Sequence, residues 1–299
     1  MKQAAQNHAD DPSPSRVQIF YNPAAGSASD RSIRKLVDEL EQQGAAVLPI
    51  SICDTSPAID PQATHICIAG GDGTIRHVAM ALAKGRIDLP VAIYPIGTVN
   101  LLASEGGLST DPEQCAEMLL SADRLKPHYP VWLGETMFFA CASIGPDSAT
   151  VAGISPKLKQ RIGRLAYVES FFRQLWRWRR PSLHITSPGR SLDCEAVYIA
   201  KGRYFAGPWS FAPHARTNDG KLHVVALRTA RRRDFLRFAW AILIGQDLKS
   251  LDGLVGFCCT QLTIDCEPET PIQADGDIVA TGPVHLSLHD FRLNFCSIN

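Results

Sequence analysis

The chain has 299 residues, of which 45% are apolar and 20% charged, so the composition is that of a folded protein with two domains of ordinary size. No run of about 18 apolar residues is present, which excludes a membrane-spanning helix of the usual length. Residues 1–15 are polar and lack the apolar core of a signal peptide, so we expect a disordered leader on a cytoplasmic protein.

The net charge of zero hides an uneven distribution. Residues 157–237 contain 18 lysines or arginines against five acids, a surplus of +13, so the remainder carries −13. A strongly basic part suits an anionic partner, either nucleic acid or a lipid headgroup layer. The nine cysteines are scattered without a zinc-like or Cys-x-x-Cys spacing, which favours reduced structural thiols.

Apolar runs alternate with helical patterns in the first 130 residues. The expected strands are 17–21, 46–52, 65–69 and 91–94, and the expected helices are 30–43, 75–83 and 112–120. This alternation predicts an α/β domain with a mainly parallel sheet, whose ligand crevice lies where the strands end.

A glycine-rich loop, Gly70-Gly71-Asp72-Gly73-Thr74, joins the third expected strand to a helix. Glycines let the backbone approach a ligand closely, and the unpaired N–H groups of a helix N-terminus attract phosphate. The alternative is an ordinary Asp-Gly turn. Asn22 and residues 97–100 follow neighbouring strands, so they would line the same crevice as this loop.

From Val131 onward the chain shows short apolar or alternating runs that predict a β-rich second domain. The expected strands are 137–143, 182–186, 194–200, 222–227, 259–265 and 284–288. Helical segments near 157–178 and 234–247 are basic and aromatic. Either their aromatic side chains pack on the sheets and their arginines are solvated, or they form a surface that contacts anionic lipid.

Four landmarks occur in order: Tyr21-Asn22-Pro23 with Gly26, the Gly70–Thr74 loop, residues 95–100 (Pro-Ile-Gly-Thr-Val-Asn), and Asp275-Gly276-Asp277. With them, the sequence resembles a bacterial member of the diacylglycerol kinase catalytic-domain family, which also includes sphingosine and ceramide kinases. The resemblance implies two domains, an α/β nucleotide domain like that of NAD kinase (16–130) and a β-sandwich for the lipid (131–289). The last strand (290–299) would return to the first domain.

The resemblance also implies an ATP- and Mg²⁺-dependent kinase that phosphorylates the hydroxyl of a lipid alcohol at the inner face of an anionic membrane. ATP would contact Asn22, Thr55, Gly70, Gly71, Asp72, Gly73, Thr74, Gly97, Thr98 and Asn100. The general base would be Asp277 or Asp275, with Asp72 in the same catalytic set. A metal site would use Asp219 and the main-chain carbonyls of Arg216 and Lys221. No nucleic-acid partner is expected, and the chain could form a homodimer.

The sequence departs from the family pattern at Leu101, where an acidic residue is usual, and at His214, where aspartate is common. Asp277 stands where the family usually has glutamate. These departures leave two other functions open. One is an NAD kinase-like enzyme, because NAD kinases share the Gly-Gly-Asp-Gly loop, and the other is a regulator that binds nucleotide or lipid through a degenerate site.

Overall fold

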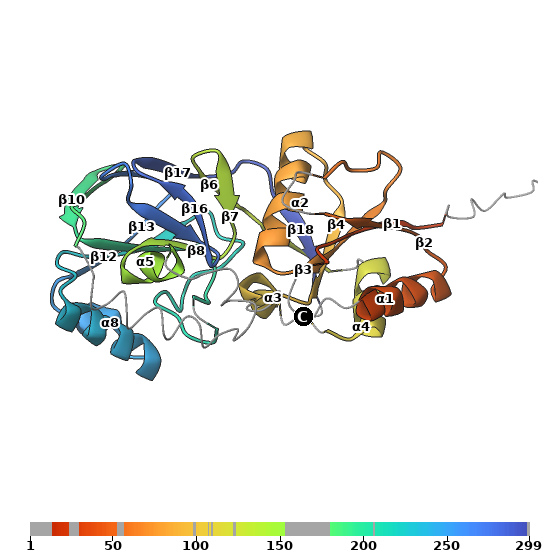
Figure 1. The fold of residues 1–299 in the computed structure, drawn as a ribbon, viewed down its shortest axis with the longest axis horizontal. Helices are drawn as coiled ribbons and strands as arrows, with labels where there is room; N and C mark the ends of the chain where they lie inside the picture. Colours follow the sequence, from red (N-terminus) through yellow and green to blue (C-terminus); the bar gives the residue numbers. More distant parts are fainter. Residues whose placement is uncertain are drawn as a thin grey trace, which may run out of the picture.

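The computed structural model describes residues 14–23, 30–52, 57–97, 100–106, 108, 110–121, 124–152, 180–205 and 207–297. They form two domains that lie side by side, an α/β domain and a β-sandwich (Figure 1). The helical segment expected near 157–178 lies outside the described residues. No helix in the described part of the chain is long and apolar enough to cross a membrane.

The first domain has one six-stranded sheet of order β2-β1-β3-β4-β18-β5. Its elements are β1 (Arg16–Tyr21), α1 (Asp30–Gln42), β2 (Ala46–Ser51), β3 (His65–Gly70), α2 (Asp72–Gly85), β4 (Pro90–Pro95), α3 (Leu101–Gly106), α4 (Pro112–Ser121), β5 (Leu125–His128) and β18 (Leu293–Cys296). Strands β1 to β4 are parallel, as expected. The late strand β18 runs parallel to β4 and antiparallel to β5.

Alternate residues of the central strand β3 point to opposite faces of this sheet, because successive side chains of a strand do so. Ile66 and Ile68 pack with the apolar face of α2, whereas Cys67 and Ala69 pack with residues of α1 and α4. Figure 1 accordingly shows α2 on one side of the sheet and α1 with α4 on the other. The helices cover both faces, and the loops that follow the strands stay at one edge.

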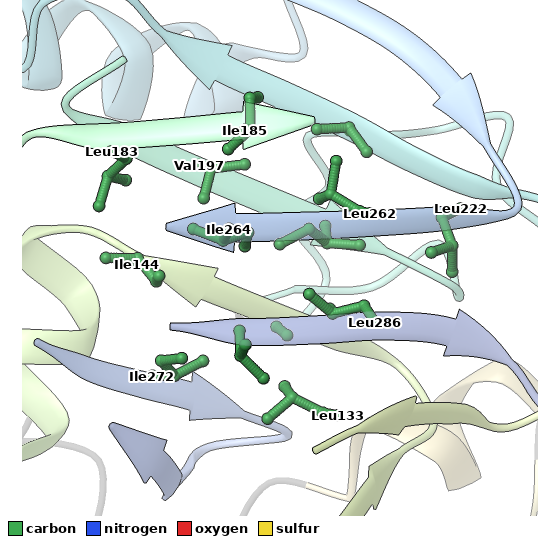
Figure 2. Close-up of a cluster of buried hydrophobic side chains, with 14 of the residues drawn as sticks. Leu133, Ile144, Leu183, Ile185, Val197, Leu222, Leu262, Ile264, Ile272 and Leu286 are labelled. Atoms are coloured by element: carbon green, nitrogen blue, oxygen red, sulfur yellow. The ribbon is translucent and has the colours of Figure 1, made fainter. Parts of the chain in front are cut away.

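The second domain packs two six-stranded sheets, of order β10-β9-β14-β17-β6-β7 and β13-β12-β11-β8-β15-β16. Its strands are β6 (Val131–Leu133), β7 (Thr136–Phe138), β8 (Cys141–Ile144), β9 (Leu183–Ser187), β10 (Arg190–Cys194), β11 (Ala196–Ala200), β12 (Leu222–Leu227), β13 (Leu254–Cys259), β14 (Gln261–Asp265), β15 (Pro271–Ala274), β16 (Asp277–Thr281) and β17 (Val284–Leu288). The helices are α5 (Pro146–Ala152), α8 (Arg232–Ile244) and the short η1 (Leu248–Ser250). Inward-facing aliphatic side chains of both sheets fill the space between them (Figure 2).

Three runs that we expected to be single strands are corners between the two sheets. Residues 137–143 divide into the end of β7 and β8, residues 194–200 into the end of β10 and β11, and residues 259–265 into the end of β13 and β14. In each case the two strands belong to different sheets. A continuous apolar run does not reveal such a corner, because both of its strands bury side chains in the same core.

Candidate active site

The glycine-rich loop leads from β3 directly into α2, which begins at Asp72. A side chain at Gly70 would collide with Thr74, whose Cβ and Oγ1 would lie 2.5 Å from the added Cβ. Gly71 is the N-cap residue of α2 and makes no side-chain capping hydrogen bond. The N-terminus of α2 therefore presents backbone N–H groups and the positive end of the helix dipole at the edge of the sheet.

A second loop, after β4, packs against the first one. A Cβ at Gly97 would lie 2.4 Å from Cα of Gly71, so only glycine allows this approach. Asn100 has a left-handed backbone (φ 55°), and its Nδ2 donates to the carbonyls of Gly97 at 2.9 Å and Pro95 at 3.3 Å. Its Oδ1 is buried without a hydrogen-bond partner among the described residues, so a ligand N–H or O–H group would satisfy it.

Asp72 binds the backbone of α3, a helix that we did not expect from the sequence. Its Oδ2 accepts from the N–H of Leu101 at 3.1 Å and its Oδ1 from the N–H of Leu102 at 3.2 Å. The carboxylate thus caps a helix that begins 29 residues later. Burial raises the pKa of Asp72 to about 6, the negative charge of Asp275 adds to the rise, and the two backbone hydrogen bonds oppose it.

The Asp275-Gly276 pair forms a tight hairpin between β15 and β16. Both residues have positive φ values, 48° and 86°, and they connect the paired residues Ala274 and Asp277. Asp275 is buried, and its carboxylate accepts three backbone N–H groups, from Phe139 at 2.8 Å, Ala140 at 2.9 Å and Cys141 at 3.0 Å. This carboxylate therefore holds the corner between β7 and β8 in place.

Asp277 approaches the glycine-rich loop from the second domain. Its Oδ2 accepts from Nη2 of Arg76 at 2.9 Å, and a Cβ at Gly73 would lie 3.3 Å from the same oxygen. The side chain of Asp277 is 38% exposed, whereas that of Arg76 is buried and lies on α2. Asp275 and Asp277 therefore have separate partners although only one residue lies between them, because Asp275 lies in the turn, where strand alternation does not apply.

The structure brings most of the expected nucleotide-binding residues to one edge of the first sheet. Asn22 follows β1 beside the end of β3, since Tyr21 pairs with Ala69, and Gly97 and Asn100 follow β4. Thr55 and Thr98 lie outside the described residues. Sequence reasoning missed Arg76, although an arginine on the otherwise apolar, buried face of α2 was a visible signal.

The expected metal-binding turn at residues 216–221 is occupied by a side chain. The Nζ of Lys201 donates to the main-chain carbonyls of Arg216 and Asp219 and lies 3.4 Å from Oδ1 of Asp219. Among the described residues no group of three or more histidine, cysteine or acidic side chains could hold a metal ion. Because the Lys201 ammonium group binds the oxygens that a metal would use, the residues of this turn do not fit a bound divalent ion as they stand.

Comparisons with known proteins agree with this architecture. Residues 16–127 match the diacylglycerol kinase catalytic domain, and residues 140–295 match the YegS C-terminal NAD kinase beta sandwich-like domain. A putative diacylglycerol kinase of Bacillus anthracis has a similar structure, with a TM-score of 0.78, 20% identity and 98% of each chain covered. The fold is thus that of a two-domain α/β and β-sandwich protein.

Sequence relatives define the family more closely. A probable lipid kinase YegS-like of Pseudomonas putida is 30% identical over 240 residues, covering 76% of this chain and 77% of the relative. The diacylglycerol kinase of Bacillus subtilis is 26% identical over 253 residues, covering 78% of this chain and 80% of the relative. The chain belongs to the family of diacylglycerol kinase-like and YegS-like lipid kinases.

Proposed function

We propose that the protein is an ATP-dependent lipid kinase that phosphorylates the hydroxyl group of a membrane lipid alcohol. The observation that supports this proposal most is the approach of Asp277 of the second domain to the glycine loop of the first, where its Oδ2 lies 3.3 Å from the position that a Cβ of Gly73 would take. It places an accessible carboxylate next to a glycine-rich helix N-terminus. Transfer of a phosphoryl group to a hydroxyl needs both parts, an anion cradle and a proton acceptor beside it.

In this mechanism the triphosphate of ATP would be held by the backbone N–H groups at the N-terminus of α2, beside the packed loops of Gly71 and Gly97. Asp277 faces the terminal phosphate and takes the proton from the attacking lipid hydroxyl. Arg76 holds the Asp277 carboxylate in this direction through the 2.9 Å hydrogen bond. Mg²⁺, when it enters with ATP, supplies charge neutralisation at the phosphates.

In this proposal Asp72 and Asp275 position other residues of the site and do not themselves take the proton. Asp72 fixes the N-terminus of α3 and with it Asn100, whose Oδ1 faces the glycine loop and would accept from the nucleotide. Asp275 fixes the corner at Phe139–Cys141 and the hairpin that carries Asp277. The acceptor of general-base catalysis is therefore Asp277.

Transfer of labelled phosphate from Mg-ATP tests this function. Purified protein is incubated with extracted membrane lipids, with NAD, or with neither, and we expect labelled product only with lipids. Diacylglycerol, a sphingoid base and ceramide, supplied separately, then identify the acceptor. Label on NAD would favour the NAD kinase-like alternative, and nucleotide binding without transfer to any acceptor would favour a regulator.

The docking surface of this kinase is, in our proposal, one face of α8. Phe235, Phe238 and Ile242 pack into the second domain, whereas the opposite face exposes large apolar side chains. These side chains are Leu236, Trp240, Leu243 and Ile244, and Trp240 is 62% exposed. Positions 236, 240, 243 and 244 share one helical face. Arg231, Arg232, Arg233 and Arg237 are also exposed on or beside this helix.

This combination fits an anionic membrane surface. Tryptophan and leucine can enter the headgroup boundary, and each nearby arginine adds on the order of 1 kcal/mol of attraction to anionic lipid. The protein is therefore expected to co-sediment with vesicles that contain anionic phospholipid and to be released by salt. Replacing Trp240 and Leu243 together by serine should weaken this binding by roughly a hundredfold or more, because burial of each side chain contributes roughly 1.5–3 kcal/mol.

Leu48→Ser is the matched control, since Leu48 is an exposed leucine on β2 of the first domain. It should leave vesicle binding unchanged. Co-sedimentation that is indifferent to anionic lipid and to Trp240 would assign the stripe on α8 to another partner. A dimer in solution that the double variant dissociates would identify that partner as a second copy of the chain.

A further inference from the structure

We propose that the ammonium group of Lys201 is a built-in cation of the turn at residues 216–221. It replaces a divalent metal ion there, so the second domain of this protein needs no bound metal. The turn belongs to the second domain, and its role goes beyond the phosphoryl transfer proposed above.

The backbone of Lys201 is fixed at the end of β11. The N–H groups of Lys201 and Gly202 both donate to the carbonyl of Ala140, at 2.8 and 2.9 Å. The side chain is fully buried, with 0% exposure, so its position is set by the surrounding protein. A lysine that is completely buried requires acceptors for all three of its N–H bonds.

The turn supplies these acceptors. They are the main-chain oxygen of Arg216 at 3.2 Å, the main-chain oxygen of Asp219, and Oδ1 of Asp219 at 3.4 Å. Main-chain carbonyls together with a carboxylate are also the ligands that Mg²⁺ or Ca²⁺ uses. The oxygens therefore form a cation site, and the cation in it is covalently attached to the chain.

The rest of the Asp219 carboxylate is also engaged. Its Oδ1 accepts from the N–H of Lys221 at 3.3 Å, and its Oδ2 lies 3.3 Å from Nε2 of His223. A divalent ion bound by Asp219 would share the carboxylate with the Lys201 ammonium at short range, and the two positive charges would repel each other. Lysine and metal thus exclude each other at this turn.

The cation site connects to the glycine loop through α3. Next to Lys201, a Cβ at Gly202 would lie 2.6 Å from Oε1 of Glu105, and the N–H of Tyr204 donates to the same oxygen at 2.8 Å. Glu105 belongs to α3, whose first turn is held by Asp72. Lys201 therefore stabilises the turn and, through Gly202 and Glu105, the packing of the second domain against α3.

Thermal unfolding of the full-length protein, freed of metal and without nucleotide or lipid, tests the proposal. The melting temperature of the wild type should not respond to millimolar Mg²⁺ or Ca²⁺. Lys201→Asn should melt roughly 5 °C or more below the wild type, because it removes the buried ammonium group that the carbonyls of Arg216 and Asp219 and the Asp219 carboxylate surround. Added Ca²⁺ should restore much of this loss, since the shorter side chain leaves room for an ion and offers it an oxygen.

Three variants complete the design. Lys201→Met fills the space without a charge, so it should be destabilised and not rescued by Ca²⁺. Lys201→Asn combined with Asp219→Asn should also lose the rescue. Lys249→Asn removes an exposed lysine and should match the wild type throughout.

Direct binding of Mn²⁺ decides the proposal independently of any unstable variant. In the absence of nucleotide, we expect no Mn²⁺ to bind at Asp219. The wild type and Asp219→Asn should therefore bind the same amount of Mn²⁺. If the wild type binds one Mn²⁺ per chain and Asp219→Asn removes it, a metal ion occupies the turn and the proposal is wrong. A Lys201→Asn protein with wild-type melting temperature and no response to Ca²⁺ would equally overturn it. Neither assay depends on phosphoryl transfer, so failure of the kinase proposal would not affect them.

Discussion

Asp277→Asn is expected to lower lipid phosphorylation by roughly 10²-fold or more while the affinity for ATP changes little. Asparagine cannot take a proton from the lipid hydroxyl, so the expected loss of turnover is the contribution that general-base catalysis usually makes. The amide oxygen can still accept the hydrogen bond from Arg76, so the contact between the domains should survive. The measurement compares turnover with lipid and the dissociation constant for ATP in both proteins.

Asp252→Asn is a suitable control for this prediction. Asp252 precedes a glycine with positive φ, as Asp275 does, but it lies in an exposed turn before β13, away from the glycine loop. Its replacement should leave turnover unchanged. A collapse of ATP affinity in Asp277→Asn, with residual turnover that follows nucleotide occupancy, would make Asp277 a binding residue and return the search for the base to Asp72.

The stability contribution of Asp72 should depend on pH. Its pKa is raised to about 6 in the folded protein and returns to the ordinary value near 4 on unfolding. Between these values the folded protein binds more protons than the unfolded chain, so the free energy of unfolding falls as the pH rises through about 6. The full difference between low and neutral pH approaches roughly 3 kcal/mol.

Urea unfolding of the wild type and of Asp72→Asn at several pH values isolates this contribution. Relative to the variant, the wild type should lose on the order of 1 kcal/mol between pH 5 and pH 7.5. Contributions of titrating groups that do not interact with Asp72 cancel in the difference. Asp38→Asn, on the exposed side of α1, should show a curve parallel to that of the wild type. If the free energy of unfolding of Asp72→Asn followed that of the wild type in parallel across this pH range, burial would not raise the pKa of Asp72.

The parts of the site that follow single strands could be predicted from the sequence. The glycine loop after β3 and the loop after β4 needed only an apolar run, a glycine and the rule that parallel strands end at one edge. The helix α3 could not be predicted, because it has only six residues and its cap, Asp72, comes from another element. Short helices depend on such tertiary contacts more than on their own sequence.

The binding partners of the charged residues could not be predicted from the sequence either. Asp275 and Asp277 stand two positions apart, yet one binds the backbone of β8 and its preceding corner and the other reaches α2. Lys201 looked like an ordinary basic residue at the end of a strand. Its role emerged only when the fold brought the carbonyls of residues 216 and 219 around its ammonium group. Partners that are distant in the chain decide these roles.

The position of β18 has a consequence for how the chain folds. This strand lies between β4 and β5, so Leu293 pairs with His128 although the whole second domain lies between them in the chain. Contacts between such distant segments slow folding, because a long loop must close before they form. During synthesis, the edge of β4 stays unpaired until β18 emerges from the ribosome, after the strands of the β-sandwich. The first domain is thus completed last, and a chaperone that shields an open strand edge would be of most use to it in that interval.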